Sequence, residues 1–369
     1  MDHSREGRLL EHALVVPGLP PPSADEQLAF LAKLQRIFAE GDFTATYKFA
    51  LLIALADLAV ERGADNGDPL PLETSQLAER FIQLYWKHVT PYATGSAEAV
   101  AGILRQNTGA QAAVVTAITA FRARVSASNP QVAARDMTYP ALVREVALTV
   151  SAQPLSFLQN FGGTTDEFIY ERAGRGQICL KPGVTYCLRR FQPLIQRLSR
   201  SRWVEHIKRN RANHSILGRA DDLEEFLFET SRQSLMALGA SLRKLDGGHC
   251  FYCGRALASI DVDHFIPFSQ YPRDLANNFV LAHPNCNRSK SDMLAAKRHL
   301  EHWVERLVRR ADEIAEIGAD VGFVADANLC KRVASWGYSR AYASQSSAWV
   351  APSLFEHIDE SYLRLVELA

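Results

Sequence analysis

Two short pairs of metal-ligating residues constrain the fold of this chain more than any other feature of its sequence. Cys250 and Cys253 have two residues between them, and His283 and Cys286 repeat that spacing. A tight turn with this spacing lets both side chains of a pair face one ion, and three sulfurs with one nitrogen suit tetrahedral zinc. Such a closed site is structural and stabilises a module that has too little core of its own. We therefore expect these four residues to form a structural Zn²⁺ site.

An Asp-His pair lies between the two halves of this expected zinc site. It consists of Asp263 and His264 and is followed by Pro267, Asn278 and Asn287. Hydrolysis of a phosphodiester needs a base for the attacking water, a cation to stabilise charge on the leaving oxygen, and a means of holding both in line. A neutral histidine can be the base near pH 7, and a carboxylate can hold a hard cation such as Mg²⁺. Alone, such a pair is most often structural, but its position inside the zinc pairs favours a catalytic role.

The stretch from about residue 245 to 295 resembles the HNH (ββα-metal) endonuclease family, in its zinc-binding, cysteine-flanked subclass. The family signature reads roughly Asp-His-x-x-Pro, then a central Asn, then Cys-Asn-x-x-Lys. In this chain it reads Asp263-His264-Phe-Ile-Pro267, Asn278 and Cys286-Asn287-Arg-Ser-Lys290. The resemblance implies two short strands and a helix with a metal ion between them. It also implies cleavage that leaves 5′-phosphate and 3′-hydroxyl ends.

The resemblance further implies a role for each matched residue. His264 would be the general base, and Asn278 would orient the loop that carries it through side-chain to backbone hydrogen bonds. Asp263 and Asn287 would hold one catalytic Mg²⁺ or Mn²⁺ ion. The residues that would approach a phosphate of the nucleic acid are Lys290 and Arg288.

Three positions in this match leave alternatives. Many zinc-bearing members of the family have cysteine where this chain has His283, although histidine is an accepted zinc ligand. Asn277 can take the place of Asn278 in the signature. Asp261 can likewise take the place of Asp263, although the residue directly before the histidine fits better.

The apolar spacing predicts helices over most of the first 150 residues. They are expected from Ser23, a plausible N-cap, to Phe38, and over 47–60, 74–88, 97–128 and 139–150. We find no catalytic constellation in this region. The pattern changes near residue 155, where a β-hairpin is predicted around Gly174 over 168–180, followed by a strand-like run over 185–188. A long helix is predicted again from 223 to 242.

We therefore expect a mostly α-helical chain with a small β element: a helical N-terminal domain and a C-terminal ββα-metal HNH module flanked by helices. A length of 369 residues suggests two or three domains. The expected parts are a regulatory or partner-binding helical domain (1–150), a β-hairpin and basic linking region (151–220), the HNH nuclease domain with its zinc site (221–315) and a helical C-terminal tail (316–369).

Residues 189–220 are strongly basic, and Glu205 is their only acidic residue. Guanidinium forks pair with phosphate oxygens, and the interleaved Trp203 could stack on a base. The alternative is a solvated helix face neutralised by the acidic run at 221–225. The candidate nucleic-acid contacts in this region are Arg200, Arg202, Lys208 and Arg209.

Composition narrows the function less than these motifs do. The chain has 41 basic and 41 acidic residues, which argues against a histone-like coating role but not against an enzyme with clustered basic residues. No stretch approaches the length of a membrane span, so a cytoplasmic location is expected. The hypothesis is an endonuclease acting on nucleic acid, with DNA favoured, as a bacterial defence or restriction effector that forms a homodimer or binds a partner protein through its N-terminal domain. The alternative is a zinc-stabilised, non-catalytic nucleic-acid-binding or scaffold subunit.

Overall fold

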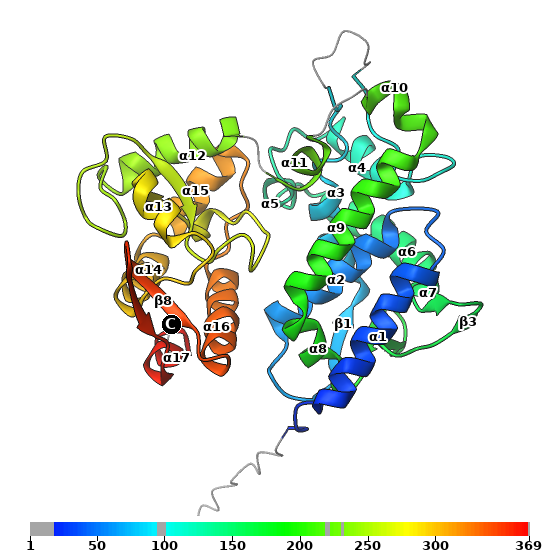
Figure 1. Ribbon diagram of the computed structural model, residues 1–369. Helices are drawn as coiled ribbons and strands as arrows, with labels where there is room; N and C mark the ends of the chain where they lie inside the picture. Colours follow the sequence, from blue (N-terminus) through cyan, green and yellow to red (C-terminus); the bar gives the residue numbers. More distant parts are fainter. Residues whose placement is uncertain (1–17, 94–100, 218–221, 230–231, 368–369) are drawn as a thin grey trace, which may run out of the picture.

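The computed structural model describes residues 18–93, 101–217, 222–229 and 232–367, which form two lobes (Figure 1). The chain is mostly α-helical with small sheets, as the sequence predicted. The elements of the N-terminal lobe are α1 (Ala24–Glu40), α2 (Tyr47–Arg62), β1 (Leu70–Glu73), α3 (Thr74–Tyr85), α4 (Ala113–Arg122), α5 (Pro130–Ala133), α6 (Tyr139–Ala152), α7 (Pro154–Phe157), β2 (Asn160–Phe161), β3 (Thr164–Thr165), β4 (Tyr170–Arg172), β5 (Gln177–Leu180), α8 (Val184–Arg190), α9 (Gln192–Arg209), α10 (His214–Leu217) and α11 (Leu223–Phe228).

The centre of the N-terminal lobe is helix α2. It is apolar on every side, and all of its residues except the last are buried, which is the pattern of a helix enclosed by others. Helices α3, α8 and α9 pack around it. One continuous core joins residues from Phe30 to Leu227, so the helical region and the hairpin region that we expected as separate parts share a single interior.

The predicted hairpin is present, and the strand predicted after it is wrong. Strands β4 and β5 pair antiparallel, and β1 adds to the other edge of β5. Residues 185–188, however, lie in helix α8. Gly183 adopts a left-handed conformation (φ 78°) that starts this helix, and Val184, Cys187 and Leu188 then fall on one buried helical face.

The long helix predicted over 97–128 is wrong in its length. Only Ala113–Arg122 forms a helix, and residues 94–100 lie outside the described part of the chain. From 101 to 112 the chain forms turns and single bridges, Tyr92 to Gly102 and Ala45 to Asn107. The run Asn107-Thr-Gly109 explains this difference because asparagine and glycine favour turns over helix interiors. The helices predicted over 47–60, 74–88 and 139–150 are confirmed to within a few residues.

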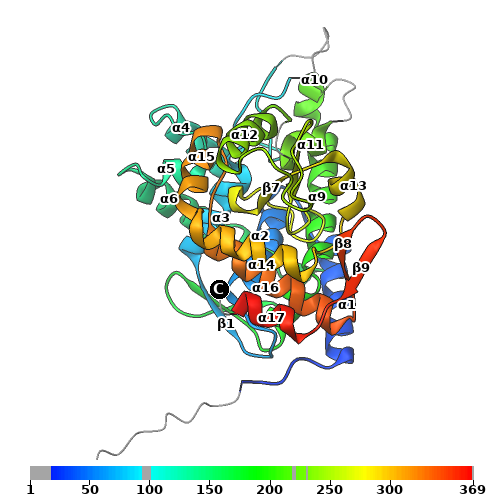
Figure 2. The same ribbon diagram turned by 90° about the vertical axis from the view of Figure 1, so that its left-hand side faces the viewer.

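The C-terminal lobe carries the two-strand and one-helix unit implied by the sequence. Strands β6 and β7 pair antiparallel with Asp263 opposite Val280 and His264 opposite Phe279. Figure 2 looks onto this lobe. Its elements are α12 (Arg232–Leu245), β6 (Asp261–His264), β7 (Phe279–Ala282), α13 (Pro284–Lys290), α14 (Lys297–Arg309), α15 (Ala311–Val321), α16 (Ala327–Ala343), β8 (Ser347–Ala351), β9 (Leu354–His357) and α17 (Glu360–Glu367).

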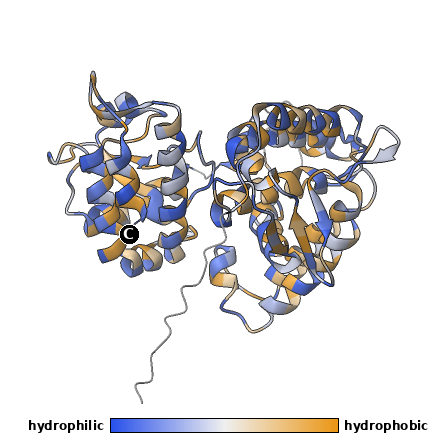
Figure 3. Ribbon diagram, turned by 90° about the horizontal axis from the view of Figure 1, so that it is seen from below, coloured by the Kyte–Doolittle hydropathy of each residue, from blue (hydrophilic) through white to orange (hydrophobic). Residues whose placement is uncertain are grey.

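The last fifty residues are part of this lobe rather than an appended tail. Helices α16 and α17 are helical as expected, but the hairpin β8–β9 lies between them. Trp336, Trp349 and Tyr362 are buried in the same core as Phe265 and Trp303. Hydrophobic residues accordingly gather inside each lobe in Figure 3. Among the described helices, none has the length and apolar character needed to cross a membrane.

A buried ionic network joins the two lobes. Glu61 of α2 accepts from Arg80 of α3 at 2.5 Å, and across the interface from Arg273 at 2.8 Å and from the Tyr271 hydroxyl at 2.6 Å. A second bond runs from the Trp336 indole to a backbone carbonyl of α8 at 3.3 Å. Charges buried in this way are stable only with their partners in place. The loop between β6 and β7 is therefore attached to the N-terminal lobe.

Candidate metal centre and active site

The four zinc-type residues converge on one point. The ligand atoms of Cys250, Cys253, His283 and Cys286 all lie within 4.8 Å of one another. Three sulfurs and one nitrogen at such separations fit a tetrahedral zinc ion, with bonds of about 2.3 Å to sulfur and about 2.0 Å to nitrogen. Within the described ranges, this is the one group of three or more His, Cys, Asp and Glu side chains close enough to share an ion.

Local turns bring the two pairs together. Gly254, with φ 69°, closes the Cys250–Cys253 turn, and its amide donates to the Cys250 carbonyl at 2.9 Å. His283 is the N-cap of α13, which places Cys286 in the first turn of that helix. The His283 Nδ1 lies 3.3 Å from the Cys253 sulfur, while Nε2 lies 3.1 Å from the Ala256 carbonyl. A bond from Nε2–H to a carbonyl fixes the ring so that Nδ1 faces the ion, as is usual for zinc histidines.

The pKa values of the cysteine thiols are consistent with a cluster that binds a cation. Burial, and then the neighbouring thiols Cys250 and Cys253, raise the pKa of Cys286 to about 12. Burial also opposes ionisation of Cys253, but hydrogen bonds from the Arg255 backbone and side chain outweigh it and lower the pKa of Cys253 to about 6. Full ionisation of the cluster therefore needs a compensating positive charge, which a zinc ion provides.

Asp263 lies beneath the surface and is held by two buried side chains. The Tyr252 hydroxyl donates to its Oδ2 at 2.5 Å, and the Lys290 ammonium lies 3.0 Å from the same oxygen. Lys290 is 0% exposed and also donates to the His264 carbonyl at 2.9 Å. Burial lowers the pKa of Lys290, and the charge of Asp263 opposes that effect. The phosphate contact expected of Lys290 does not fit this placement; the side chain instead fixes Asp263 and the end of β6.

Asn287 contacts Asp261 rather than Asp263. Its Nδ2 donates to the Asp261 Oδ2 at 3.1 Å, and both residues are half-buried on the rim of a cavity. Because side chains alternate along a strand, Asp261 and Asp263 share the face of β6 that α13 covers. Together with Asn287 they offer the oxygen ligands that Mg²⁺ or Mn²⁺ prefers, with room for water on the Asp261 side. The chemistry of these side chains suits a hard cation, and Asp261 lies nearer to Asn287 than the expected Asp263 does.

His264 lies at the end of β6 and has a carboxylate partner that the sequence did not point to. Its Nε2 is 2.7 Å from the Asp274 Oδ1, and the His264 side chain is 19% exposed. The ring also packs against Phe268 and Phe279, with centroids at 5.2 and 4.4 Å. These contacts hold the imidazole in one orientation. Asp274 lies ten residues from His264 in an irregular loop, so no strand or helix period could have linked the two.

Asn278 fastens the same loop. Its Oδ1 accepts from the Ile266 amide at 2.8 Å, and its Nδ2 donates to the Ile266 carbonyl at 2.9 Å. The neighbouring Asn277 is 1% exposed, and its side-chain amide has no hydrogen-bond partner within the described residues. Of the two asparagines that the sequence left open, Asn278 is the one bonded to the loop that follows His264.

The basic residues predicted as nucleic-acid contacts are dispersed. Arg200 is turned into the interface between the lobes, where it donates to the Pro272 carbonyl at 2.6 Å. Arg202 and Arg209 are exposed on α9 and both pair with Glu205, at 2.9 and 2.5 Å. Lys208 is exposed on the same helix, which belongs to the other lobe from α13 (Figure 1).

Trp203 differs from the expectation, whereas the phosphate contact of Arg288 stays a prediction. Trp203 is fully buried, and its indole donates to Gln106 at 2.8 Å, so it is part of the core and unavailable for stacking on a base. Arg288 is exposed on α13 and bonds within its own helix, to Asn285 at 2.7 Å. It follows Asn287 in the chain, and of the two predicted phosphate contacts on α13 it is the exposed one, since Lys290 is buried.

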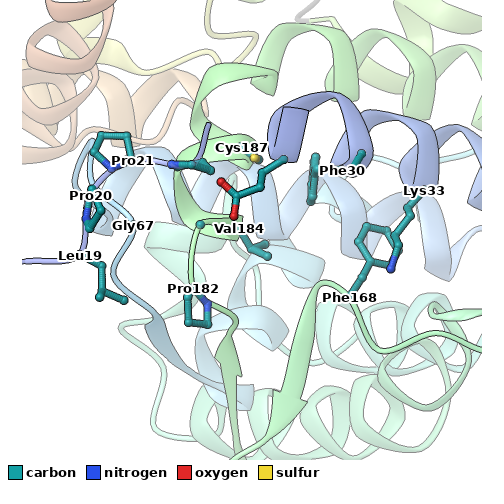
Figure 4. A pocket seen from close by; sticks show the side chains of 14 residues that line it. Leu19, Pro20, Pro21, Phe30, Lys33, Gly67, Phe168, Pro182, Val184 and Cys187 are labelled. Carbon is teal, nitrogen blue, oxygen red and sulfur yellow. The ribbon is translucent and has the colours of Figure 1, made fainter. Parts of the chain in front are cut away.

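A cavity of about 440 Å³ lies in the N-terminal lobe (Figure 4). Proline rings, Phe30 and Phe168 line much of it, with Lys33 at one side, and Glu26 and Cys187 belong to its lining as well. Burial raises the pKa of the Cys187 thiol to about 11, which keeps it protonated and unreactive. The catalytic residues predicted from the sequence all lie in the C-terminal lobe.

The sequence matches two protein families. Residues 27–227, more than half of the chain, match the family described as "Domain of unknown function (DUF8808)". Residues 250–293 match the family described as "HNH endonuclease", which confirms the resemblance seen in the sequence. No curated protein and no solved structure matches the chain.

Proposed function

Because this chain belongs to the family of the domain of unknown function DUF8808 and carries an HNH endonuclease domain in its C-terminal lobe, we propose that it is a metal-dependent endonuclease that hydrolyses phosphodiester bonds in DNA. The contact between His264 and Asp274, at the end of a strand that also bears Asp261 and Asp263, is the observation that carries the proposal. It gives a candidate base a fixed orientation at the end of the strand that carries oxygen ligands for a cation.

His264 is the general base in this proposal. Its Nε2 is bonded to Asp274, and among the described residues no hydrogen bond engages Nδ1. Nδ1 therefore accepts a proton from the attacking water. The water oxygen forms the new bond to phosphorus while the bond from phosphorus to the 3′-oxygen breaks, and the leaving oxygen takes a proton from solvent. The products are a 5′-phosphate and a 3′-hydroxyl, and the carboxylate of Asp274 stabilises the imidazolium that forms.

The remaining residues position this reaction. Asp261, Asp263 and Asn287 would hold a divalent cation, which stabilises the charge that develops on the leaving oxygen. Lys290 and Tyr252 keep Asp263 in place from the interior. Asn278 holds the loop after His264, and the Cys₃His cluster, filled with zinc, would fix the start of α13, and with it Asn287.

Cleavage by the purified protein and by His264→Ala tests the proposal. Linear duplex, supercoiled plasmid, single-stranded DNA and RNA are incubated with magnesium, with manganese or with a chelator. We expect metal-dependent cutting of DNA that falls by roughly 10²- to 10⁴-fold in His264→Ala. His357→Ala, an exposed histidine of β9, is the matched control and should cut like the wild type. A wild-type rate in His264→Ala would remove His264 as the base.

A non-catalytic role is the second candidate function. The Lys290 ammonium already compensates the charge of Asp263, so this carboxylate does not require a cation. A zinc-stabilised subunit that binds DNA or scaffolds a complex would have the same folded module. Binding of DNA without cutting under any metal condition would favour this second function.

The biological role follows by analogy and is also proposed. A nuclease domain behind a large helical lobe suits a bacterial defence or restriction effector whose helical lobe receives the trigger. One active site cuts one strand, so a homodimer suits the cutting of both strands. Phage plating on cells that carry the wild type or His264→Ala, and the mass of the protein in solution with and without DNA, test these two points.

A further inference from the structure

A groove runs along the HNH module between helix α12 and strand β6. It has a volume of about 820 Å³. The helix lies against the strand at Gly239, where an added Cβ would lie 2.9 Å from a methyl group of Val262. The floor of the groove is therefore formed by small and apolar residues, and glycine is required for this spacing.

The wall formed by α12 is basic at both ends and apolar in the middle. Arg232, Met236, Ala240 and Arg243 recur at intervals of three or four residues and lie on one face of the helix. All four are exposed, and Met236 is 75% exposed. Lys244 extends the basic end. At 1.5 Å per residue, the two basic ends are about 16 Å apart along the helix.

The cations on this wall have no acidic partner among the described residues. Within the described residues, none of Arg232, Arg243 and Lys244 takes part in an ion pair closer than 4.0 Å. Arg243 uses one nitrogen to donate to the Leu257 carbonyl at 3.0 Å, which fixes its stem and leaves its other donors to the groove.

The opposite wall contains residues of the proposed active site. Asp261 and Asn287 line the same groove and are bonded to each other at 3.1 Å. Asp261 is the only acidic side chain among the described residues that line it. A molecule that lies along the basic wall therefore passes Asp261 and Asn287, two of the three residues proposed to hold the cation.

We propose that this groove binds the DNA strand to be cut. Arg232 at one end, and Arg243 with Lys244 at the other, would contact phosphates on either side of the scissile bond. Met236 between them would contact a sugar or base. The inference rests on the proposed nuclease function and adds where the substrate lies. Charge complementarity supports it because phosphate contacts dominate the affinity of proteins for nucleic acid.

The basic residues of α9 provide a matched comparison. Arg202 and Arg209 share Glu205 as their partner, and their helix belongs to the other lobe. Replacing three cations by glutamine in either place changes the net charge by the same amount. The groove variant is Arg232→Gln, Arg243→Gln and Lys244→Gln, and the α9 variant is Arg202→Gln, Lys208→Gln and Arg209→Gln.

Binding is measured in the His264→Ala protein, which prevents cutting in the presence of magnesium. The probes are labelled single-stranded and duplex DNA oligonucleotides and an RNA of the same sequence, over a series of salt concentrations. We expect the groove variant to lose about 10- to 100-fold in affinity for DNA, and its slope of log affinity against log salt to fall by about one for each lost phosphate contact. The α9 variant should lose much less.

A gain-of-affinity variant separates loss of binding from loss of folding. Ala240→Lys adds a cation in the middle of the groove at an exposed helical position. It should bind DNA more tightly and steepen the salt slope. Equal affinity losses in the groove and α9 variants, or unchanged binding in the groove variant, would overturn the groove while the nuclease function stands on wild-type cutting. Absence of any nucleic-acid binding and cutting would overturn both.

Discussion

The Oδ1 of Asp274 lies 2.7 Å from the Nε2 of His264, and both side chains are mostly buried. The backbone next to each of these two residues is held by a further hydrogen bond or ion pair. Asn278 holds the backbone just after His264, and Arg273, next to Asp274, is bonded to Glu61 of the other lobe. The orientation of the proposed base therefore depends on groups in both lobes.

Replacement of Asp274 should lower the rate of cutting without weakening substrate binding. In Asp274→Asn the amide can no longer stabilise the imidazolium, and we expect kcat to fall on the order of 10²-fold with KM little changed. Asp274→Glu keeps the charge and should recover part of the rate. Steady-state cleavage kinetics measure this. A loss confined to KM in Asp274→Asn would instead place this carboxylate in substrate binding.

Lys290 should act on stability rather than on phosphate binding. Lys290→Met leaves the buried carboxylate of Asp263 without its cation, and we expect a loss of about 3 to 5 kcal/mol in the free energy of unfolding. Denaturant titration measures it. Exposed Arg288→Met is the control on the same helix and should cost much less. Unchanged stability, together with a reduced salt slope for DNA binding, would restore the phosphate contact that the sequence suggested.

Removal of the zinc ligands should unfold the C-terminal lobe in part and release one metal ion. In Cys250→Ser the site has two sulfurs and one nitrogen, and the turn before β6 loses its connection to α13. We expect about one equivalent of zinc in the wild type and a much lower content in the variant, measured by elemental analysis. Cys330→Ser, a buried thiol outside the cluster, should keep its zinc. Equal zinc content in Cys250→Ser would show that the cluster is not the binding site.

Acid should weaken the contact between the lobes through Glu61. Burial raises the pKa of this carboxyl, but the charges of Arg80 and Arg273 outweigh burial, so the folded-state pKa lies below the ordinary value of 4.5. A carboxyl with a depressed pKa contributes stability that is present above pH 4.5 and is lost as the pH falls through its folded value. Thermal unfolding of the wild type between pH 7 and pH 3 should therefore show this loss.

The matched variants are Glu61→Gln and Glu205→Gln. Glu61→Gln should cost about 3 to 5 kcal/mol near neutral pH and flatten the acid dependence, because two buried arginines lose their shared carboxylate. Glu205→Gln removes an exposed partner of two arginines and should cost less than about 1 kcal/mol. If the two variants were equally stable, the buried network would not hold the lobes together.

The zinc cluster and the ββα unit could be predicted from the sequence because their residues lie close together in the chain. Cys250 to Lys290 fold through short turns, so spacing alone carries the geometry. The same is true of helix α1, where Ser23 and Glu26 form the capping box expected of a start signal. Motif spacing and capping signals were sufficient wherever the contacting residues lie close together in the sequence.

The predictions that were wrong or missing concern residues whose partners lie far away in the sequence. Asp274 reaches His264 through an irregular loop, and Lys290 contacts the side chains of Asp263 and Tyr252, which lie in two other segments of the chain. Neither contact follows a repeating interval in the sequence that could have been recognised. Arg200 and Trp203 share a basic helix with exposed arginines, and only tertiary packing decides which of them face inward. Residues 185–188 look like a strand, but packing around Gly183 makes them helical.

The network around Glu61 also bears on whether the HNH domain could be used outside its own chain. Arg273 and Tyr271 belong to the C-terminal lobe but find their carboxylate in the N-terminal one. A fragment containing the C-terminal lobe alone would expose an arginine and a tyrosine shaped for an absent acid, three residues or fewer from Asp274. The HNH domain of this chain is therefore not expected to be stable when it is transferred alone to another protein. A fusion that transplants it would have to carry α2 with it, or supply a new acid at that position.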